Sequence, residues 1–407
     1  MDYDLAFVGG GFRTTSFLSS APDLFAFRTA VFERGDGMGP GGFGDYGITT
    51  TSVGSRFLKD LSRHGPLGLM RESPQVAQVA GAEEPVHMQQ LARALREVGS
   101  AVTHELGSEH VHLRSEVAAI NLSSSGPEAE LRLSDGRQVR CRHVVVASGR
   151  IERPNPELAS WKARVRLSGD IISHSGRSRL RTTLGALAGR SIVIAGSSHS
   201  AMSALQVLLQ LVQENRDLRP EYQAPVIHVL QRSPARLMYE SLTAAQAQQV
   251  VGRERLVDPA TDVCPQSGIV YRDSGLRHES RALYCALWQG EIPGAKLVRA
   301  ARLGESAGLL DDAALVIQAL GYRGHAPDIL VDGVMVRPSD SQQRLGHTED
   351  GAALIGGHTY PSLSVLRIEP TPLELRDHSV YGSGLYKQLA VRIGTCLSST
   401  KALETHV

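Results

Sequence analysis

The sequence predicts an α/β protein with two Rossmann-like dinucleotide-binding domains, the second inserted into the first. Two segments support this class, because each runs from a buried apolar strand through a turn of small residues into a helix, at residues 4–33 and 191–212. A third observation is the β-hairpin predicted around Asp135-Gly136, which a buried strand follows. We expect the first part of one domain over 1–150, the inserted domain over 151–310, and the returning part with a C-terminal helix over 311–407.

The composition of the chain limits its classes of function. Its 407 residues are enough for two or three domains, and 42% hydrophobic and 21% charged residues are ordinary for a globular protein. A net charge of +1 implies no general attraction to nucleic acid or membranes, and few residues are aromatic. No apolar run approaches the roughly 20 residues of a membrane span, and we find no signal peptide. The four widely spaced cysteines, expected to be reduced, favour a cytoplasmic protein.

The first nucleotide-binding segment begins with the strand 5–8, and three glycines follow directly. Gly9 permits a tight turn, and Gly11 lets the backbone approach a pyrophosphate, whose charge meets free N–H groups of the next helix. Thr14 stands where the third glycine of this fingerprint is usual. The next strand ends on Glu33, 22 residues after Gly11, where an acid that binds a ribose hydroxyl belongs. An ordinary glycine turn is the alternative, and the combined pattern favours a nucleotide site.

The elements that follow complete the first part of the domain. Residues 35–47 contain seven glycines, which indicates either a mobile surface loop or a backbone that lies against a flat ligand; the place after Glu33 favours the ligand. Residues 48–61 begin as β structure and end as a polar helix, and 86–98 is an amphipathic helix with Gly99 just beyond its end. The strands expected next are 113–122, 130–133, 138–141 and 143–149.

The second nucleotide-binding segment has serines where the first has glycines. The strand 191–195 leads into the pattern G-x-S-x-x-A at 196–201, and a helix follows to about Val212. Serine still allows close approach of a phosphate and can donate a hydrogen bond to it. Residues 151–190, by contrast, read as irregular and basic. Their arginines could form a phosphate-facing patch, although a solvated loop is the favoured interpretation.

The end of the next strand, 226–230, carries arginine instead of an acid. Arg232 follows this strand, and Arg236 lies close behind. A guanidinium can hold a ribose 2′-phosphate in forked geometry, whereas an acid such as Glu33 suits an unphosphorylated ribose. The comparison predicts two different nucleotides, with NADPH at the second site. Ordinary surface charges are the alternative for both arginines.

The rest of the chain contains fewer signals. Residues 240–293 read as helical or irregular, strands are expected at 295–300 and 313–320, and 385–397 reads as a final helix. The glycine-containing stretch 356–360 is a possible loop near a ligand.

The ordered set of motifs resembles the NADPH-dependent flavin monooxygenases with two dinucleotide-binding folds. The motifs are, in chain order, Gly9-Gly10-Gly11, His174-Ser175, Gly196-Ser197-Ser198-His199-Ser200-Ala201 and Ala319-Leu320-Gly321-Tyr322. Within this class the chain looks most like the lysine/ornithine N-hydroxylase branch. Thr51-Ser52 with Phe57-Leu58-Lys59-Asp60-Leu61 is similar to the T-S-F-L-K-D-L stretch of that branch, with an insertion, and Leu389-Ala390-Val391-Arg392 is similar to its last helix. The segment after Leu61 is shorter than in hydroxylases of free ornithine or lysine, and the Baeyer–Villiger signature has only a loose relative at 167–174.

The resemblance implies an FAD- and NADPH-dependent monooxygenase that inserts one oxygen atom through a flavin C4a-hydroperoxide. The substrate would be a small nucleophile, most simply an amine or an amino-acid-derived compound that becomes N-hydroxylated. The residues that would bind FAD are Gly9, Gly10, Gly11, Phe12, Arg13, Glu33, Arg34 and Val117. Those for NADPH are Gly196, Ser197, Ser198, His199, Ser200, Arg232, Ser233, Arg236 and Tyr322. His174, His199 and His358 are candidates near the reaction centre, although a structural or surface role is the simpler interpretation of each.

Two other classes stay open at this point. One is an NADPH-dependent flavin reductase or oxidase on the same fold, and the other is a non-catalytic binding protein that keeps the fold. The partners expected are a small-molecule substrate and O2, without nucleic acid or membrane, and a homo-oligomer is possible. We expect no metal site.

Overall fold

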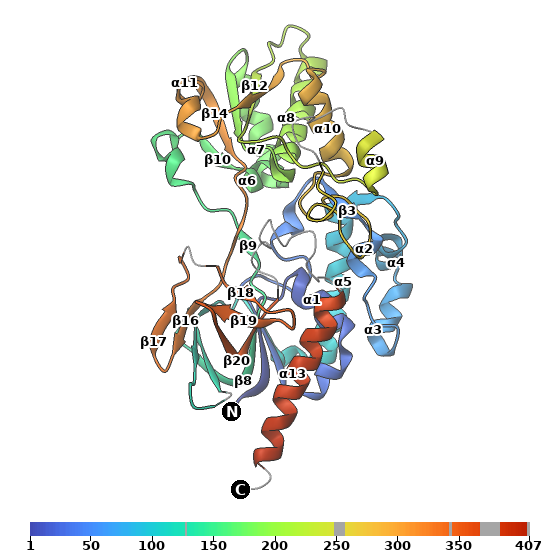
Figure 1. The fold of residues 1–407 in the computed structure, drawn as a ribbon, viewed down its shortest axis with the longest axis vertical. Helices are drawn as coiled ribbons and strands as arrows, with labels where there is room; N and C mark the ends of the chain where they lie inside the picture. The colour runs from blue at the N-terminus through green and yellow to red at the C-terminus, as the bar shows by residue number, and fades with distance from the viewer. Residues whose placement is uncertain (127, 248–256, 342–343, 367–382, 405–407) are drawn as a thin grey trace.

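The computed structural model describes residues 1–407 except 127, 248–256, 342–343, 367–382 and 405–407. This part of the chain forms two sheet-based domains, one above the other, with both termini at the lower end (Figure 1). The chain crosses between the domains twice, through β9 (Arg150–Ile151) and β15 (Arg323–Gly324), which pair antiparallel. The upper domain is therefore an insertion in the lower one, as the sequence predicts.

The lower domain is built on a sheet of eleven strands within the described residues. Its centre is β1 (Tyr3–Val8), which pairs in parallel with β2 (Thr29–Glu33) on one side and β8 (Gln138–Val146) on the other. Val8 lies opposite Phe32 and Val146, so three apolar strands end at one edge. The other strands are β5 (Val111–Leu113), β6 (Val117–Leu122), β7 (Ala129–Leu133), β16 (Asp328–Val331), β17 (Val334–Arg337), β18 (Gly346–His347), β19 (Ala352–Ile355) and β20 (His358–Val365).

The predicted hairpin is present, since β7 and β8 pair antiparallel around Asp135-Gly136, and Gly136 has φ 90°. The strands expected at 138–141 and 143–149 are one continuous strand, β8, which returns the chain to β1. A small separate sheet pairs β3 (Thr49–Val53) with β4 (Pro85–His87).

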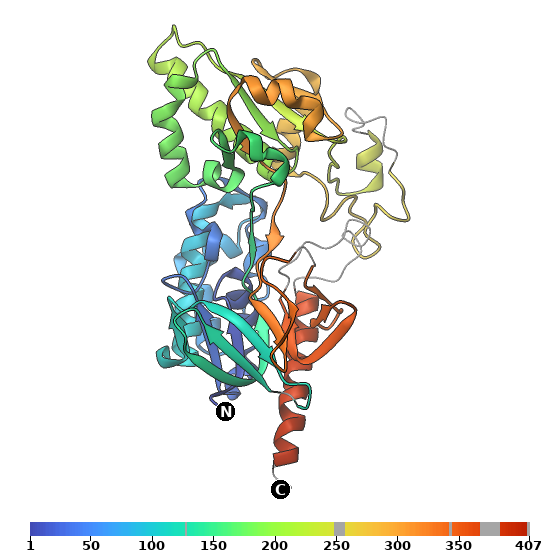
Figure 2. The ribbon, with the colours of Figure 1, turned by 90° about the vertical axis from the view of Figure 1, so that its left-hand side faces the viewer.

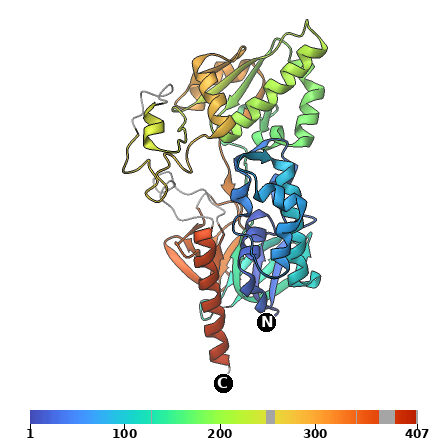
Figure 3. The ribbon, with the colours of Figure 1, turned by 90° about the vertical axis from the view of Figure 1, so that its right-hand side faces the viewer.

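The lower domain also contains helices, some of which pack on the sheet and others on α5 (Met88–Leu106). They are α1 (Phe12–Ser20), α2 (Ser55–Leu58), α3 (Gly65–Leu69), α4 (Pro74–Ala80), α5 (Met88–Leu106) and α13 (Ser383–Glu404), with 3-10 turns η1 (Pro22–Ala26), η2 (Gly41–Asp45), η3 (Met70–Glu72) and η4 (Ser108–His110). Figure 3 shows α13 running down the outside of this domain. Its apolar side chains, among them Tyr386 and Leu389, share a core with α1 and α5.

The predicted end of the long helix at Gly99 is wrong. Helix α5 continues to Leu106 and ends at Gly107, whose φ of 87° suits glycine. Gly99 is instead buried inside the helix, where a Cβ atom would lie 2.7 Å from the carbonyl oxygen of Met38. Glycine at this position lets the glycine-rich loop lie directly against the helix backbone.

Within the residues that the structure describes, the upper domain has a five-stranded parallel sheet. Its strands, in spatial order, are β10 (Val165–Leu167), β14 (Ala313–Gln318), β11 (Ser191–Ala195), β12 (Val226–Gln231) and β13 (Ala295–Arg299). Because β14 belongs to this sheet, the upper domain extends past residue 310, where the sequence places its boundary. The return crossing, drawn in orange in Figure 2, follows β14.

Helices also pack on the upper sheet, and they include part of a stretch that the sequence marks as irregular. They are α6 (Ser168–Ile172), α7 (His174–Thr183), α8 (His199–Leu218), α9 (Leu242–Ala247), α10 (His278–Gln289) and α11 (Ala307–Asp312), with 3-10 turns η5 (Pro156–Trp161), η6 (Leu184–Leu187) and η7 (Leu303–Ser306). The expectation of irregular structure over 151–190 is therefore wrong. The many arginines made this stretch resemble a solvated loop. In the structure, Arg177 and Arg181 of α7 both pair with Glu214 of α8, at 3.0 and 2.9 Å. Residues 248–256 of the stretch 240–293 lie outside the described residues.

Two further observations concern chemistry and location. All four cysteines are among the described residues, and none of them forms a disulfide. Within the described ranges, no helix has the length and the apolar character needed to cross a membrane.

Candidate active site

The first cleft lies at the carboxyl ends of β1, β2 and β8 and has a volume of about 470 Å³. Gly9 turns the chain there with φ 104°, and a Cβ atom on it would be 2.7 Å from the carbonyl oxygen of Ala147. Gly11 caps α1 without any side-chain hydrogen bond, so the first N–H groups of the helix remain for a ligand. A Cβ atom on Gly11 would be 3.3 Å from Cα of Gly41. Gly9 leaves no room for a side chain and Gly11 leaves little, and this close approach fits a pyrophosphate cradle.

All but one of the remaining residues expected at FAD line this cleft; the exception is Gly10, whose N–H binds the Glu33 carboxylate. Phe12, Arg13, Glu33, Arg34 and Val117 all line it. The carboxylate of Glu33 accepts the N–H groups of Gly10 and Gly35, at 2.5 and 2.7 Å. These bonds hold the acid at the end of β2, where a ribose would meet it.

The structure also shows where the glycine-rich loop and Thr14, at the third fingerprint position, lie relative to this cleft. Residues 40–43 line the cleft, which agrees with a backbone that lies against a ligand. Thr14, at the position of the missing third glycine, is fully buried, and its hydroxyl donates to the carbonyl of Gly9. The threonine thus stabilises the turn at Gly9.

The second cleft, of about 800 Å³, opens at the N-terminus of α8. Ser197, Ser198, His199 and Ser200 line it, and the hydroxyls of Ser198 and Ser200 lie 3.3 Å apart. Gly196 has φ 119°, and a Cβ atom on it would overlap the carbonyl oxygen of Ala319 at the end of β14. The second sheet therefore repeats the geometry of the first, with the turn glycine against the end of the neighbouring strand.

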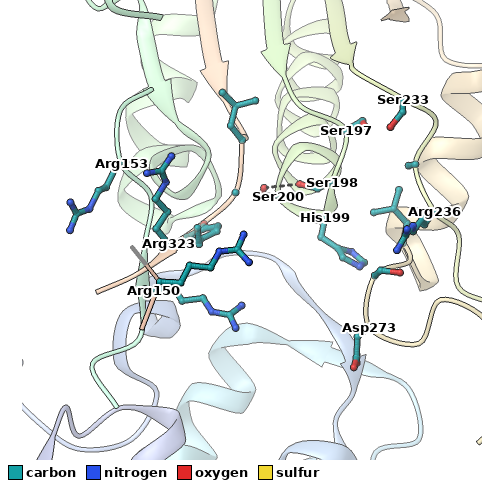
Figure 4. Close-up of a pocket in the computed structure, with 18 of the residues that line it drawn as sticks. Arg150, Arg153, Ser197, Ser198, His199, Ser200, Ser233, Arg236, Asp273 and Arg323 are labelled. Carbon is teal, nitrogen blue, oxygen red and sulfur yellow. Dashed lines mark hydrogen bonds between the residues drawn. The ribbon is translucent and has the colours of Figure 1, made fainter. Parts of the chain in front are cut away.

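Arginine side chains surround this second cleft. Among the described residues that line it, five are arginines and only Asp273 is acidic. Arg150, Arg153 and Arg323 lie on one side and Arg236 on the other (Figure 4). The fifth is Arg344. This charge suits a ligand with several phosphate groups.

The arginine expected from the sequence does not line the cleft. Arg232 is exposed and lies outside the lining, whereas Ser233 and Arg236 are part of it. The guanidinium of Arg236 lies 5.3 Å from the ring centre of Tyr271. Sequence reasoning missed Arg150 and Arg323, although each stands beside a strand-end glycine, and missed Arg153 and Arg344 as well.

The two clefts join. Arg150, His199, Ser200 and Tyr322 line both of them. A ligand in one cleft can therefore contact a ligand in the other at this junction, which is the arrangement that hydride transfer between two cofactors requires.

His199 is held in its neutral form. Its Nε2 lies 3.2 Å from the carbonyl oxygen of Gly275, so this nitrogen carries the proton that it donates. Burial, with Arg277 nearby, lowers its pKa to about 4. Nδ1 is then a buried acceptor with no hydrogen-bond partner in the described part of the chain. Nδ1 of His325, which lines the first cleft, is buried in the same way. The open acceptor of His199 and the unpaired ring nitrogen of His325 fit bound ligands that form hydrogen bonds with them.

The other two candidate histidines do not join the site. His174 begins α7 and packs under Gly47, where a Cβ atom would be 3.1 Å from the ring. His358 begins β20 and is exposed. Neither lines one of the two clefts. The sequence placed both near glycines or small residues, but only the fold decides which such turns face a cleft.

A carboxyl group that the sequence did not single out lies close to the junction. Glu152 follows the first crossing strand and accepts hydrogen bonds from the Ser168 hydroxyl at 2.6 Å and the Gly169 N–H at 2.7 Å. Burial raises its pKa, and the hydrogen bonds oppose that shift. The hydroxyls of Tyr46 and Tyr322 lie on the same side of Gly169.

Comparisons with known proteins agree with this architecture. A family model described as flavin-containing amine oxidoreductase matches residues 7–164. A curated relative, the CMP-5′-(3-aminopropyl)phosphonate hydroxylase of Streptomyces rubellomurinus, is 27% identical over 325 residues, which are 72% of this chain and 70% of the relative.

Solved structures share the fold at lower identity. The ornithine N-hydroxylase of Kutzneria sp. 744, with reduced FAD, NADP⁺ and L-ornithine, has a TM-score of 0.59 at 18% identity and covers 99% of this chain and 100% of its own. The FAD-bound cadaverine monooxygenase of Erwinia amylovora has a TM-score of 0.62 at 13% identity. The match covers 97% of this chain and 95% of that one. These likenesses confirm the predicted fold class and agree with an oxidoreductase that uses FAD and NADPH. The chain has the fold of the NADPH-dependent flavin monooxygenases with two dinucleotide-binding domains, the class that its sequence motifs resemble.

Proposed function

We propose that this protein is an FAD- and NADPH-dependent monooxygenase that N-hydroxylates an amine. The observation that carries the proposal is the junction of the two clefts, where Arg150, His199, Ser200 and Tyr322 face both. Overall, an amine, O2, NADPH and a proton would give a hydroxylamine, NADP⁺ and water, which balances atoms and electrons. When FAD is bound, it accepts the hydride and activates O2.

The residues of the first cleft fit FAD. The free N–H groups at the start of α1 would hold the pyrophosphate, and the Glu33 carboxylate would accept a hydrogen bond from the ribose. Val117, at the start of β6, lines the cleft and would contact the adenine. The lack of room for a side chain at Gly9, and the tight contact of Gly11 with Gly41, support this assignment.

The residues of the second cleft fit NADPH. The start of α8 would meet the pyrophosphate through Ser197–Ser200, and the arginine-rich lining would meet the additional 2′-phosphate. Among the arginines that line this cleft, Arg236 is nearest in sequence to the end of β12, where the selecting residue of such a domain belongs. Neutral His199 would accept a hydrogen bond through Nδ1 at the junction.

The chain contributes positioning and the exclusion of water more than acid–base catalysis. Tyr46, Tyr322 and Glu152 fill the space between the domains beside the junction. They would keep water from the reacting groups, which limits loss of activated oxygen. The curated relative is named as a hydroxylase of a compound that carries an aminopropyl group, which supports an amine as the substrate.

Purified protein tests the proposal. We expect bound FAD, reduction of FAD by NADPH, and a product heavier than its amine by one oxygen atom, measured by mass spectrometry over a panel of amines. A flavin reductase or oxidase would instead return all electrons as hydrogen peroxide with every amine. Protein that retains no flavin under any condition would leave only the non-catalytic alternative.

A further inference from the structure

We infer that Tyr271 is a positioning residue for the selection of NADPH over NADH, because its ring holds the Arg236 guanidinium in place inside the second cleft; this rests on the proposed function. Arg236 lines that cleft, and its guanidinium lies 5.3 Å from the centre of the Tyr271 ring. Tyr271 is 4% exposed and is not among the described residues that line the cleft. It therefore acts on a ligand through Arg236 and not by direct contact.

Tyr271 belongs to the segment 258–277, which forms one wall of the second cleft. Three residues of this segment line the cleft: Asp273, Ser274 and Leu276. The carbonyl oxygen of Gly275 accepts the hydrogen bond from Nε2 of His199. The N–H of Leu276 donates to the carbonyl oxygen of Arg236 at 2.7 Å. The segment thus binds the start of α8 and the loop after β12, both of which contribute to this cleft (Figure 4).

The backbone of Tyr271 has an unusual conformation. Its φ is 46°, in the left-handed region that a bulky side chain rarely adopts. Its N–H donates to the carbonyl oxygen of Asp262 at 2.8 Å, and its own carbonyl oxygen accepts the N–H of Gly275 at 2.9 Å. The Tyr271 hydroxyl also donates to the Asp262 carboxylate at 2.8 Å. Backbone strain of this kind persists only where the surrounding structure imposes it, and it gathers at functional sites. These contacts fix the ring in one orientation.

A fixed ring restricts a side chain that is otherwise flexible. An arginine loses rotamer freedom when it binds a ligand, and a guanidinium held against a ring has lost part of that freedom beforehand. The attraction between the cation and the face of the ring supplies the hold. A guanidinium has five N–H donors, so Arg236 can keep its contacts within the protein and still donate to a phosphate. The Tyr271 ring thus prepares Arg236 for the extra 2′-phosphate of NADPH.

The effect should be specific to the 2′-phosphate, because NADPH and NADH differ in this group alone. His199 lies at the junction of the clefts, which the part shared by both cofactors would reach. A general loosening of the segment 258–277 would release the contact between Gly275 and His199, and it would weaken both cofactors. Loss of the Tyr271 ring should weaken only the phosphorylated one. A ligand without the 2′-phosphate therefore reports on the fold of the segment.

Calorimetry on the FAD-loaded full chain measures the effect without turnover. The probes are adenosine 2′,5′-bisphosphate and AMP, which differ only in the 2′-phosphate. We expect Tyr271→Leu to weaken binding of the bisphosphate about fivefold and to leave AMP within about twofold. Tyr271→Phe keeps the ring and should keep the bisphosphate affinity within about twofold. Equal losses in the two variants, or no loss in either, would show that the ring does not position Arg236.

A double-variant cycle tests whether Tyr271 acts through Arg236. Arg236→Gln should weaken binding of the bisphosphate more than Tyr271→Leu does, and Tyr271→Leu should add no further loss to it. Additive losses would mean that the ring affects the ligand by another route, and they would overturn the inference. Circular dichroism checks that each variant folds. Tyr271→Met serves for the same comparison if the leucine variant does not fold, because its longer side chain fills more of the space.

Tyr239→Leu is the matched control. Tyr239 is a tyrosine of the same domain with 7% exposure, and the guanidinium of Arg281 lies 5.1 Å from its ring centre. Arg281 lines neither of the two clefts, so this substitution should leave the binding of both probes unchanged. An equal effect at positions 239 and 271 would show that loss of any buried ring disturbs the domain, and the inference would fail.

The outcomes separate this inference from the proposed function. If Tyr271→Leu weakens the bisphosphate selectively but no amine is oxygenated, the inference stands and N-hydroxylation fails. If an amine is oxygenated but the variant binds both probes as the native chain does, the proposed function stands and the inference fails. The inference also fails if the native chain binds the bisphosphate no more tightly than AMP.

Discussion

The phenol oxygens of Tyr46 and Tyr322 lie 3.3 Å apart, so one hydrogen bond spans the space between the two domains. Tyr46 follows η2 in the lower domain, and Tyr322 stands on the crossing segment after β14. Burial raises the pKa of both phenols, and Glu152 adds to this for each. The pair is therefore neutral at any working pH and can fix the domains without a charge.

Tyr322→Phe should weaken this link. A neutral hydrogen bond contributes about 0.5–1.5 kcal/mol, which corresponds to a roughly 2–10-fold loss. We expect this loss in NADPH-dependent flavin reduction, measured by stopped-flow absorbance, with FAD content unchanged. Tyr46→Phe should give the same loss, and the double variant should lose no more than either single one. Additive losses would show that the two hydroxyls act separately.

Arg236→Gln should discriminate between the nicotinamide cofactors. Arg236 lines the second cleft and Arg232 does not, so the change at 236 should raise KM for NADPH at least tenfold and change KM for NADH less than twofold. Arg232→Gln is the matched comparison, because it removes the same charge nearby. The sequence alone favours Arg232 for this role, so a larger effect there would restore the sequence-based assignment.

Gly196→Ala should damage the second cleft. A methyl group would overlap the carbonyl oxygen of Ala319, and the φ of 119° disfavours any L side chain. The strain is on the order of 1–3 kcal/mol, or the loop moves to avoid it. We expect weaker NADPH binding and a lower melting temperature with normal FAD content. Gly308→Ala, in α11 of the same domain with open space around it, should be neutral or slightly stabilising.

Glu33→Ala should weaken FAD retention. The carboxylate accepts two backbone N–H groups and lines the first cleft, so its loss loosens the turn and removes the expected ribose contact. A charged hydrogen bond contributes about 1.5–3 kcal/mol, so FAD affinity should fall at least tenfold in equilibrium dialysis. Asp36→Asn is the control, because its ion pair with Arg114 is on the surface. Full FAD occupancy in the Glu33 variant would remove the ribose role.

The stability of the lower domain should fall in acid through His143. Its Nε2 lies 2.9 Å from the Ser364 hydroxyl, it is 1% exposed, and burial lowers its pKa from 6.5 to about 3. In the unfolded chain this side chain takes up a proton near pH 6.5, whereas in the folded chain it does so only near pH 3. The free energy of unfolding therefore decreases as pH falls from 6.5 toward 3. At pH 5 the loss would be about 2 kcal/mol.

Urea unfolding at pH 7.5 and pH 5 measures this effect. His143→Gln cannot be protonated, so its deficit in stability relative to the native chain should shrink by about that amount at the lower pH. A deficit at position 143 that does not change with pH would show that the folded chain accepts the proton.

The nucleotide-binding segments were readable because their signals are local. Strands 5–8 and 191–195, the glycines that follow them and the acid at Glu33 lie within one strand–turn–helix–strand unit, and the structure places each as expected. The failures were contacts between distant segments. Gly99 was taken as a helix end because nothing in the sequence shows that Met38 lies against it. The inserted domain was ended too early because β14 pairs with β11, which lies more than a hundred residues before it.

The amino-acid sequence by itself determined the fold class, the two turns that can approach a pyrophosphate, and the contrast of an acid in one half with arginines in the other. Those properties depend on neighbouring residues, whose spacing fixes their geometry. Only the tertiary structure decided which side chains line the clefts: it joined the two clefts at His199 and Tyr322, and it placed Arg236 in the lining of the second cleft and Arg232 outside it. Side chains that far apart in the chain come together through the packing of whole domains, which no local pattern encodes.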